Sequence, residues 1–304
     1  MFNVSAIITT CKRDSNTVRR AILSILNQSY KTTEIIVVDD SPEDFQGRKD
    51  VEKMIKELSC DSCHIIKYIK HERCMGACAA RNAGLLAASG EIIGYLDDDD
   101  EWCDNKIELL INEFTDSEVG LVYCNYKRHD DDTGKETNVK VDDCCENAYP
   151  HLIKHNCIGG TSFPLLRKEA IKNAGCFDIE MLSVQDLDLW LRIAQKYKIR
   201  YVDEYLNIYH VHSGEQISRN KYKRFMGLKR LNDKNSEYLL KHPDAFYTRY
   251  IRLTPYYAKA GKKKKAIMIW LECVKRSPVT VINNIKSLAV IIVEKKDNEL
   301  NIPD

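Results

Sequence analysis

The sequence predicts an α/β fold with a parallel sheet covered by helices, followed by an all-helical C-terminal part. Three observations support this prediction. Short apolar runs alternate with amphipathic helical segments through the first hundred residues. Polar side chains stand directly after these apolar runs. From Ser218 to Val293 the pattern is helical throughout.

Four buried strands and three helices are expected in alternation at the N-terminus. In the first helix, Val18, Ala21, Ile22, Ile25 and Leu26 recur at helical spacing. Sheets of this kind bind ligands beyond the carboxyl ends of their strands, so a site is expected there. The predicted strands are Val4–Thr9, Glu34–Asp39, Ile65–Ile69 and Glu91–Leu96, and the helices are Thr17–Gln28, Asp50–Leu58 and Gly76–Ala88.

The middle of the chain, from about residue 119 to 214, predicts a mixed region. It contains a polar hairpin at Lys127–Lys140, a helix at Asp186–Tyr197, and two short strands at Ile199–Val202 and Leu206–Val211. Beyond it, Tyr247–Arg276 resembles a helical hairpin that turns at Gly261.

Charged residues are distributed unevenly along the chain, although the formal net charge is only +1. Residues 1–214 contain 26 Lys and Arg against 36 Asp and Glu, whereas residues 215–304 contain 20 against 9. The acidic first part argues against nucleic acid as the main ligand. The basic part, with Lys262–Lys265, Trp270 and the stretch Ile282–Val293, suits an anionic membrane surface. Solvated lysines on helices that pack against the first part are the alternative.

The N-terminus lacks the pattern of a signal peptide, and the apolar run Leu288–Val293 is too short to span a bilayer. A cytoplasmic protein, peripheral to the inner face of the plasma membrane or free of it, is therefore expected. Its twelve cysteines are expected to be reduced. Cys60 and Cys63 have CxxC spacing but lack a second pair to complete a zinc site.

Four consecutive carboxylates, Asp97 to Asp100, end the predicted strand at 91–96. They repel one another unless a cation lies among them. Carboxylate oxygens suit Mg²⁺ or Mn²⁺, which proteins often bind together with substrate phosphates. A solvated acidic turn and a loose Ca²⁺ loop are the alternatives. The position at a strand end favours a metal bound to phosphate.

Six ordered segments resemble the family 2 glycosyltransferases, which adopt the GT-A fold, and in particular those of bacterial surface-polysaccharide assembly. The resemblance covers residues 3–214 and implies a catalytic domain at 1–214 and a basic helical extension at 215–304. The matching segments are Thr9–Arg13, Val37–Ser41, Gly76–Gly84, the acidic motif Asp97–Trp102, Gln185–Arg192 and Tyr209–Gly214.

The resemblance implies a binding site for a nucleotide diphosphate sugar, with UDP as the nucleotide. Asp39 would contact the uracil and Asp97 the ribose, while Arg81 would hold the diphosphate or the acidic cluster. Asp99 would be the main ligand of a divalent metal, Mn²⁺ or Mg²⁺, and His212 a further metal or phosphate contact. The residues implied for donor binding are Thr9, Cys11, Arg13, Asp39, Arg81, Asp97 and Asp98.

The resemblance also implies that Asp186 is a general base, which removes the proton of an acceptor hydroxyl in an inverting transfer. The acceptor would be a glycan or a lipid-linked glycan. Alternatively, Asp186 is a helix N-terminal carboxylate that interacts favourably with the helix dipole. Three positions depart from the family: Gln185 replaces a frequent Glu, Cys74 a frequent Asn, and Cys11 a frequent aromatic residue.

Two other functions have to be weighed. A nucleotide-sugar pyrophosphorylase needs a glycine-rich loop near its N-terminus, and Ala6–Asp14 contains no glycine. A non-catalytic scaffold of the same fold needs neither Asp99 nor Asp186, and both are present. A glycosyltransferase is therefore the function that the sequence favours.

Overall fold

The structure is a computed structural model that describes residues 2–32, 34–61, 65–211, 220–277, 285–297 and 299–303. The chain divides into two units, each of which is described by itself. The first unit contains Met1–Leu152, Asn156–Ile179 and Asp186–Ser213. The second unit contains Ile153–His155, Glu180–Gln185 and Gly214–Asp304.

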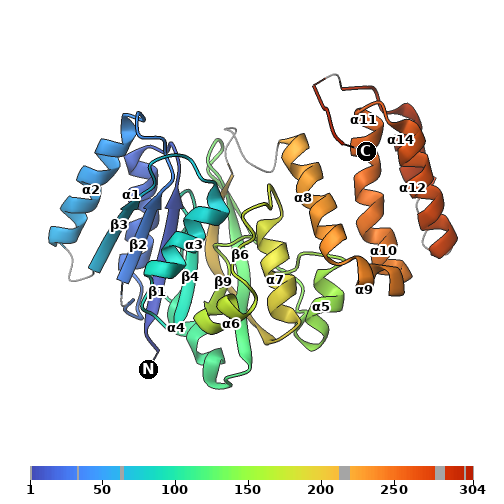
Figure 1. Cartoon of the computed structure of the whole chain (residues 1–304). Coiled ribbons are helices and arrows are strands. Elements are labelled where there is room, and N and C mark those ends of the chain that lie inside the picture. The colour runs from blue at the N-terminus through green and yellow to red at the C-terminus, as the bar shows by residue number, and fades with distance from the viewer. Residues whose placement is uncertain are drawn as a thin grey trace. The chain divides into compact units, whose positions relative to one another are not determined.

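Within the described residues, the first unit is built on one mixed sheet of nine strands (Figure 1). The strand order is β3-β2-β1-β4-β8-β6-β9-β5, and β7 pairs with β6. The first four strands are mutually parallel, and β8 joins them to β6 through antiparallel pairs. The strands are β1 Val4–Thr10, β2 Glu34–Asp39, β3 Ile65–Lys70, β4 Ile92–Asp97, β5 Glu101–Trp102, β6 Val119–Asp130, β7 Lys135–Val139, β8 Leu165–Arg167 and β9 Lys198–Val211.

Helices cover both faces of this sheet, as the apolar runs of β1 and β2 require. Because side chains alternate along a strand, Ala6 and Ile8 join one core cluster with α1 and α2, while Ile7 faces α3. Gly84 permits this approach, since a Cβ there would lie 2.4 Å from Ile7 Cγ2. The helices of this unit are α1 Ser15–Leu26, α2 Gly47–Asp61, α3 Ala77–Ala87, α4 Lys106–Ile111, η1 Asn112–Thr115, η2 Cys145–Asn147, α5 Ala148–Leu152, α6 Lys168–Asn173 and α7 Gln185–Ala194.

The predicted strands and helices of the first hundred residues are confirmed, with ends that differ by a few residues. The hairpin predicted at Lys127–Lys140 is confirmed as β6 and β7. The two short strands predicted at Ile199–Val202 and Leu206–Val211 are wrong as separate elements, because β9 is continuous from Lys198 to Val211.

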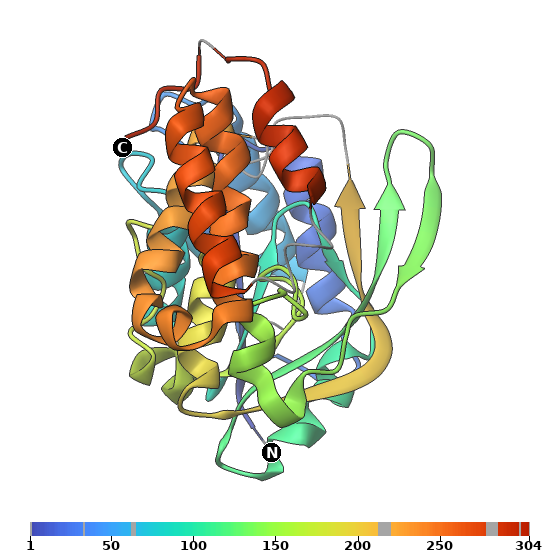
Figure 2. The same ribbon diagram turned by 90° about the vertical axis from the view of Figure 1, so that its right-hand side faces the viewer.

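Irregular pairing explains that error. Along the β6–β9 ladder the register shifts between Cys124 and Asn125 and again between Asn125 and Tyr126. The extra β9 residues, around Asp203 and Glu204, interrupt the sequence pattern without ending the strand. Figure 2 shows the β6–β7 hairpin beside the end of β9.

The second unit is helical and has its own core. Its apolar cluster includes Phe225, Leu228, Tyr257, Ala266 and Ile291. Its helices are α8 Lys221–Lys234, α9 Ser236–Lys241, α10 Pro243–Tyr250, η4 Ile251–Leu253, α11 Thr254–Lys259, α12 Lys263–Arg276 and α14 Ile285–Val293.

The helical hairpin predicted at Tyr247–Arg276 is confirmed in outline. Gly261, with φ of 78°, makes the turn in the left-handed region that glycine favours. The arm before the turn is not one helix, because η4 separates α10 from α11. Among the described residues, no helix is long and apolar enough to cross a membrane.

Candidate active site

The carboxyl ends of β1, β2 and β4 bring the predicted site residues together. In the sheet register Thr9 lies opposite Val38 on one side and Asp97 on the other, and Thr10 lies opposite Asp39. Parallel pairing therefore places three of the predicted donor residues at one edge of the sheet.

Asp97 is held by two side chains from outside its strand. A terminal nitrogen of Arg81 donates to Asp97 Oδ1 at 2.8 Å, and Arg81 itself is buried. Thr161 Oγ1 lies 3.0 and 3.1 Å from the two carboxylate oxygens of Asp97. The Asp97 side chain is still 36% exposed, so it can contact a ligand.

Arg13 clamps the next two carboxylates. Its Nε donates to Asp98 Oδ1 at 3.0 Å, and its NH2 nitrogen donates to Asp99 Oδ2 at 2.9 Å. Burial raises the pKa of Asp98 to about 6, although Arg13 opposes this shift. Burial, followed by the charges of Asp97 and Asp99, also raises the pKa of Asp100 well above its usual value.

The acidic strand end fits a divalent cation. The Asp97 and Asp99 side chains are 36% and 24% exposed, whereas Asp98 is buried against Arg13. Partly exposed carboxylate oxygens are hard donors of the kind that Mg²⁺ and Mn²⁺ prefer. Arg13 and Arg81 compensate only part of the negative charge of these four carboxylates, which favours a bound cation.

Asp186 lies in the first turn of α7 and is half-buried. Asn156 Nδ2 donates to its Oδ2 at 3.2 Å. Burial by itself lowers the pKa of Arg81, but the charges of Asp97 and Asp186 raise it, so that the net shift is upward.

A loop that the sequence prediction missed connects these groups. Residues 156–162 supply Asn156 to Asp186 and Thr161 to Asp97, and Ser162 Oγ donates to Asp100 at 2.6 Å. Trp190 Nε1 of α7 donates to Gly159 O at 3.1 Å and holds the loop against that helix. The Gly159-Gly160 pair, followed by Thr161 and Ser162, was a local signal of this loop.

Comparisons with known proteins decide the family. Residues 5–174 match the model of glycosyl transferase family 2. The chain belongs to this family. It is therefore a glycosyltransferase, and the family predicted from its six motifs is confirmed.

Several bacterial enzymes are similar to this family 2 glycosyltransferase. The Escherichia coli UDP-Glc:alpha-D-GlcNAc-diphosphoundecaprenol beta-1,3-glucosyltransferase WfaP is 31% identical over 224 residues, which cover 73% of this chain and 82% of WfaP. The Campylobacter jejuni GalNAc(5)-diNAcBac-PP-undecaprenol beta-1,3-glucosyltransferase is 26% identical over 276 residues, which cover 88% of this chain and 86% of that enzyme.

Solved structures confirm the predicted GT-A type of fold. S. aureus TarS gives a TM-score of 0.63 at 15% identity and covers 95% of this chain, which spans 53% of TarS. A TarS fragment, 1–349, in complex with UDP gives a TM-score of 0.55 at 14% identity, covering 90% of this chain and 88% of the fragment.

The loops at the carboxyl ends of β1 and β2 are held by contacts of Asp39 and Asp40. Asp39 is buried, and its carboxylate accepts from the Ser41 backbone N–H at 2.8 Å and from Tyr68 Oη at 2.6 Å. Asp40 accepts from the backbone N–H groups of Met75 and Gly76, which fixes the start of α3. These carboxylates shape the loops of this edge.

Two of the positions that depart from the family face each other. Cys11 and Cys74 are exposed, with their Sγ atoms 4.0 Å apart. Cys11 Sγ also lies 3.4 Å from the carbonyl oxygen of Asp40. Two polarizable thiols therefore lie together beside the carboxyl end of β1.

Two histidines belong to the segment Tyr209–Gly214, which resembles a motif of the family. His210 faces inward and is buried between Glu101 and Asp131. His212, the predicted metal or phosphate contact, lies outside the described residues. In the described part of the chain, two surface hollows of about 560 and 690 Å³ belong to the second unit, and no predicted site residue lines them.

Proposed function

We propose that this family 2 glycosyltransferase moves a sugar from a UDP-sugar to a hydroxyl of a lipid-linked glycan, with inversion at the anomeric carbon, during surface polysaccharide assembly. WfaP is named for UDP-Glc, and both it and the Campylobacter enzyme are named for diphosphoundecaprenol or PP-undecaprenol acceptors. The UDP complex of the TarS fragment supports the choice of nucleotide.

The donor is proposed to bind at the edge formed by β1, β2 and β4. Thr9, Cys11 and Asp39 are proposed to contact the uridine, Asp97 its ribose, and Arg13, Arg81 and Asp98 the diphosphate. A divalent ion, Mn²⁺ or Mg²⁺, held by Asp99 and by His212 from outside the described residues, would neutralise charge on the leaving diphosphate. Residues 1–214 are proposed to form the catalytic domain.

Asp186 is proposed to act as the general base. Its carboxylate accepts the proton of the acceptor hydroxyl while the hydroxyl oxygen bonds to the anomeric carbon and the bond to UDP breaks. One observation carries this assignment: the loop of residues 156–162 contacts Asp186 through Asn156 and Asp97 through Thr161. This shared loop supports a single site that contains both the strand end and the base.

Replacing Asp186 by Asn tests the base. Turnover with UDP-glucose and a diphosphoundecaprenol-linked acceptor should fall about 10²- to 10⁴-fold while the melting temperature changes little. Glu169→Gln is a matched control, because Glu169 is an exposed carboxylate in the first turn of α6. Equal activities of Asp186→Asn and the wild type would favour a mere helix-dipole role for Asp186.

A thermal-shift screen tests the donor site. UDP with Mn²⁺ at about 100 times its Kd should stabilise the protein by about 2.7 kcal/mol. Asp99→Asn should remove the part of this shift that depends on the metal, whereas Asp104→Asn, at an exposed position nearby, should keep it. Absence of a shift with every nucleotide tried would contradict the donor assignment.

The basic helical extension, residues 215–304, is proposed to bind an anionic membrane surface. It makes up most of the second unit. Its helix α12 exposes Met268 and Leu271, and α14 exposes Ile292 and Val293. Exposed lysines at 263–265 begin α12. Apolar side chains beside basic ones are typical of helices that lie on anionic bilayers.

Vesicle co-sedimentation tests the membrane proposal. Met268→Glu with Leu271→Glu should release the protein from vesicles that contain phosphatidylglycerol, without loss of its melting transition. Leu86→Glu is a control, because Leu86 is an exposed apolar residue of α3 in the first unit. Point substitutions are preferable to deletion, since Ala266, Cys273 and Ile291 belong to the buried core. Equal binding of all variants would refute the proposal.

A further inference from the structure

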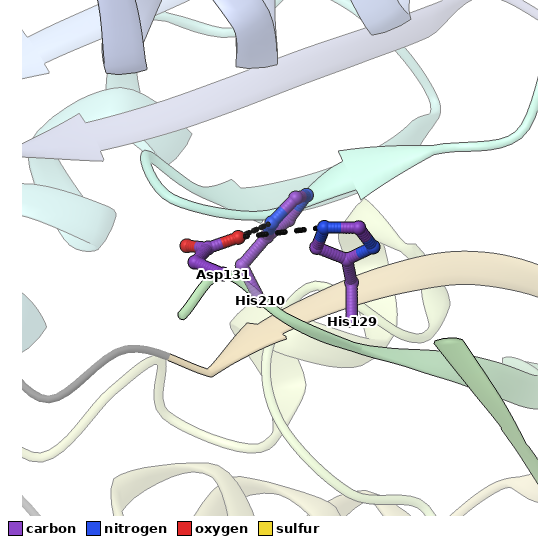
Figure 3. Close-up of side chains that lie close together, drawn as sticks. All are labelled: His129, Asp131 and His210. Atoms are coloured by element: carbon purple, nitrogen blue, oxygen red, sulfur yellow. Dashed lines mark hydrogen bonds and ion pairs between the residues drawn. The ribbon is translucent and has the colours of Figure 1, made fainter. Parts of the chain in front are cut away.

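Three potential metal ligands meet at the end of the β6–β9 ladder, in the first unit. They are His129 near the end of β6, Asp131 directly after it, and His210 in β9. One ligand atom from each lies within 4.8 Å of the others. Figure 3 shows the Asp131 carboxylate directed toward both imidazole rings.

The sheet itself dictates this arrangement. His129 pairs directly with His210 in the parallel register, and the backbone N–H of Asp131 donates to Val211 O at 3.0 Å. Residues two apart on a strand project from the same face, so His129 and Asp131 reach the same side. The ring centroids of the two histidines are 4.9 Å apart.

His210 has the environment of a metal-binding histidine. Its Nδ1 lies 2.6 Å from Asp131 Oδ1, and its Nε2 lies 2.8 Å from Glu101 Oε1. In metal sites, the ring nitrogen that does not bind the metal commonly donates to a carboxylate, which orients the ring. Glu101 stands in that position, and β5 pairs with β9 to keep it there.

The cluster is open on one side. The His129 and Asp131 side chains are each 31% exposed, whereas His210 is 5% exposed. An ion can therefore enter from solvent and keep water in its remaining coordination positions. Two imidazoles and one carboxylate favour Zn²⁺, Fe²⁺ or Co²⁺ over Mg²⁺, which prefers oxygen donors.

We propose that His129, Asp131 and His210 bind a divalent transition-metal ion, with Zn²⁺ as the best match, and that Glu101 orients the His210 ring. The ion replaces the hydrogen bond between His210 Nδ1 and Asp131 Oδ1. Two ligands of one tetrahedral zinc ion lie about 3.3 Å apart. Asp131 Oδ1, now 2.6 Å from His210 Nδ1, therefore moves away from it, and the His129 ring, with Nε2 3.8 Å from Asp131 Oδ1, moves inward.

This site is distinct from the proposed sugar-donor site at Asp97–Asp100 and does not rest on the proposed reaction. The two are neighbours, because the backbone N–H of His210 donates to Asp100 Oδ1 at 3.3 Å. The ion would join the β6–β7 hairpin to β9 and β5 immediately beside the acidic strand end.

Calorimetric titration of the full chain with Zn²⁺, and the visible absorption of bound Co²⁺, test the proposal. The wild type should bind one equivalent of Zn²⁺ at micromolar concentration and give a Co²⁺ spectrum with nitrogen ligands. His129→Ala and Asp131→Asn should each weaken Zn²⁺ binding at least 100-fold. Glu101→Gln should weaken it about 10- to 100-fold.

Two comparisons separate this site from other zinc binding. His242→Ala, which removes a histidine of the second unit, should leave Zn²⁺ binding unchanged. Asp99→Asn should also keep it while losing the metal-dependent response to UDP. The partly exposed His129 and Asp131 can be replaced without opening the core, and the melting temperatures of the metal-free variants check this. Equal Zn²⁺ affinity in all variants, or no binding by the wild type, overturns the proposal.

Discussion

The two units of the chain compensate buried charge differently. In the first unit, Glu34 is 2% exposed but accepts from Ser5, Ser89 and Lys67. In the second unit, Arg249 is 1% exposed and only its Nε has a partner, Asn232 Oδ1 at 3.1 Å. Neither terminal nitrogen of Arg249 has a hydrogen-bond partner, and no carboxylate among the described residues pairs with it.

The difference indicates what each unit is organised to do. Buried charges of the first unit hold strand ends and loops in place, as Arg81 does for Asp97. Burial, together with the positive charges of Arg252 and Arg224, lowers the pKa of Arg249 to about 9. The second unit therefore carries an uncompensated cost to its stability. Three substitutions test this comparison, from the largest expected effect to the smallest.

Lys106→Leu should lower the free energy of unfolding by about 3 kcal/mol. Lys106 is fully buried, lies 4.5 Å from the centre of the Trp102 ring, and donates to Ser162 O and Asn207 Oδ1. Leucine fills similar space but removes the donor to Asn207 Oδ1, while Ser162 O keeps its bond from Trp102 Nε1. Urea denaturation measures the effect. A loss below about 1 kcal/mol would show that the hydrogen bonds donated by the buried Lys106 contribute little to the stability of the first unit.

Glu34→Gln should cost about 2–3 kcal/mol at pH 7. Burial raises the pKa of Glu34, but hydrogen bonds from Lys67, Ser89 and Ser5 outweigh it and lower the pKa to about 2. Because the folded-state pKa is depressed, this stabilisation is complete above about pH 4.5 and is lost as the pH falls toward 2. The difference between wild type and variant in urea denaturation should therefore shrink across this range.

Glu52→Gln serves as the control for Glu34, since Glu52 pairs with Lys56 and Lys70 in a more exposed setting. It should cost at most about 0.5 kcal/mol. Equal losses from the two substitutions would mean that burial does not distinguish these ion pairs.

Arg249→Met should raise the free energy of unfolding by about 1 kcal/mol, because it removes a buried charge without a carboxylate partner. Arg276→Met is the control: Arg276 is more exposed and pairs with Glu272. Thermal denaturation measures the stability of both variants. A marked destabilisation by Arg249→Met would show that the guanidinium is compensated after all.

Much of the first unit could be predicted from the sequence because its signals are local. The parallel strands are buried on both faces, so they appear as uninterrupted apolar runs such as Ile35–Val38. The polar residues after them, Thr9, Asp39 and Asp97, meet at one edge because parallel strands end together.

The contacts that organise the site could not be predicted in this way. Arg13 reaches Asp98 and Asp99, and Asn156 reaches Asp186, across long stretches of sequence that carry no periodic signal. The pairing of His129 with His210 depends on the register of β6 and β9, and this register changes within the ladder. No local pattern specifies such a shift.

The irregular stretch of β9 makes the spacing of this segment as important as its composition. Between Val202 and Asn207 the register moves so that His210 faces His129 and its N–H reaches Asp100. Inserting or deleting one residue there would turn every later side chain to the opposite face of the sheet. Relatives that keep both histidines but differ in length at 203–205 would therefore lack this cluster, and an alignment by residue identity alone would group them wrongly.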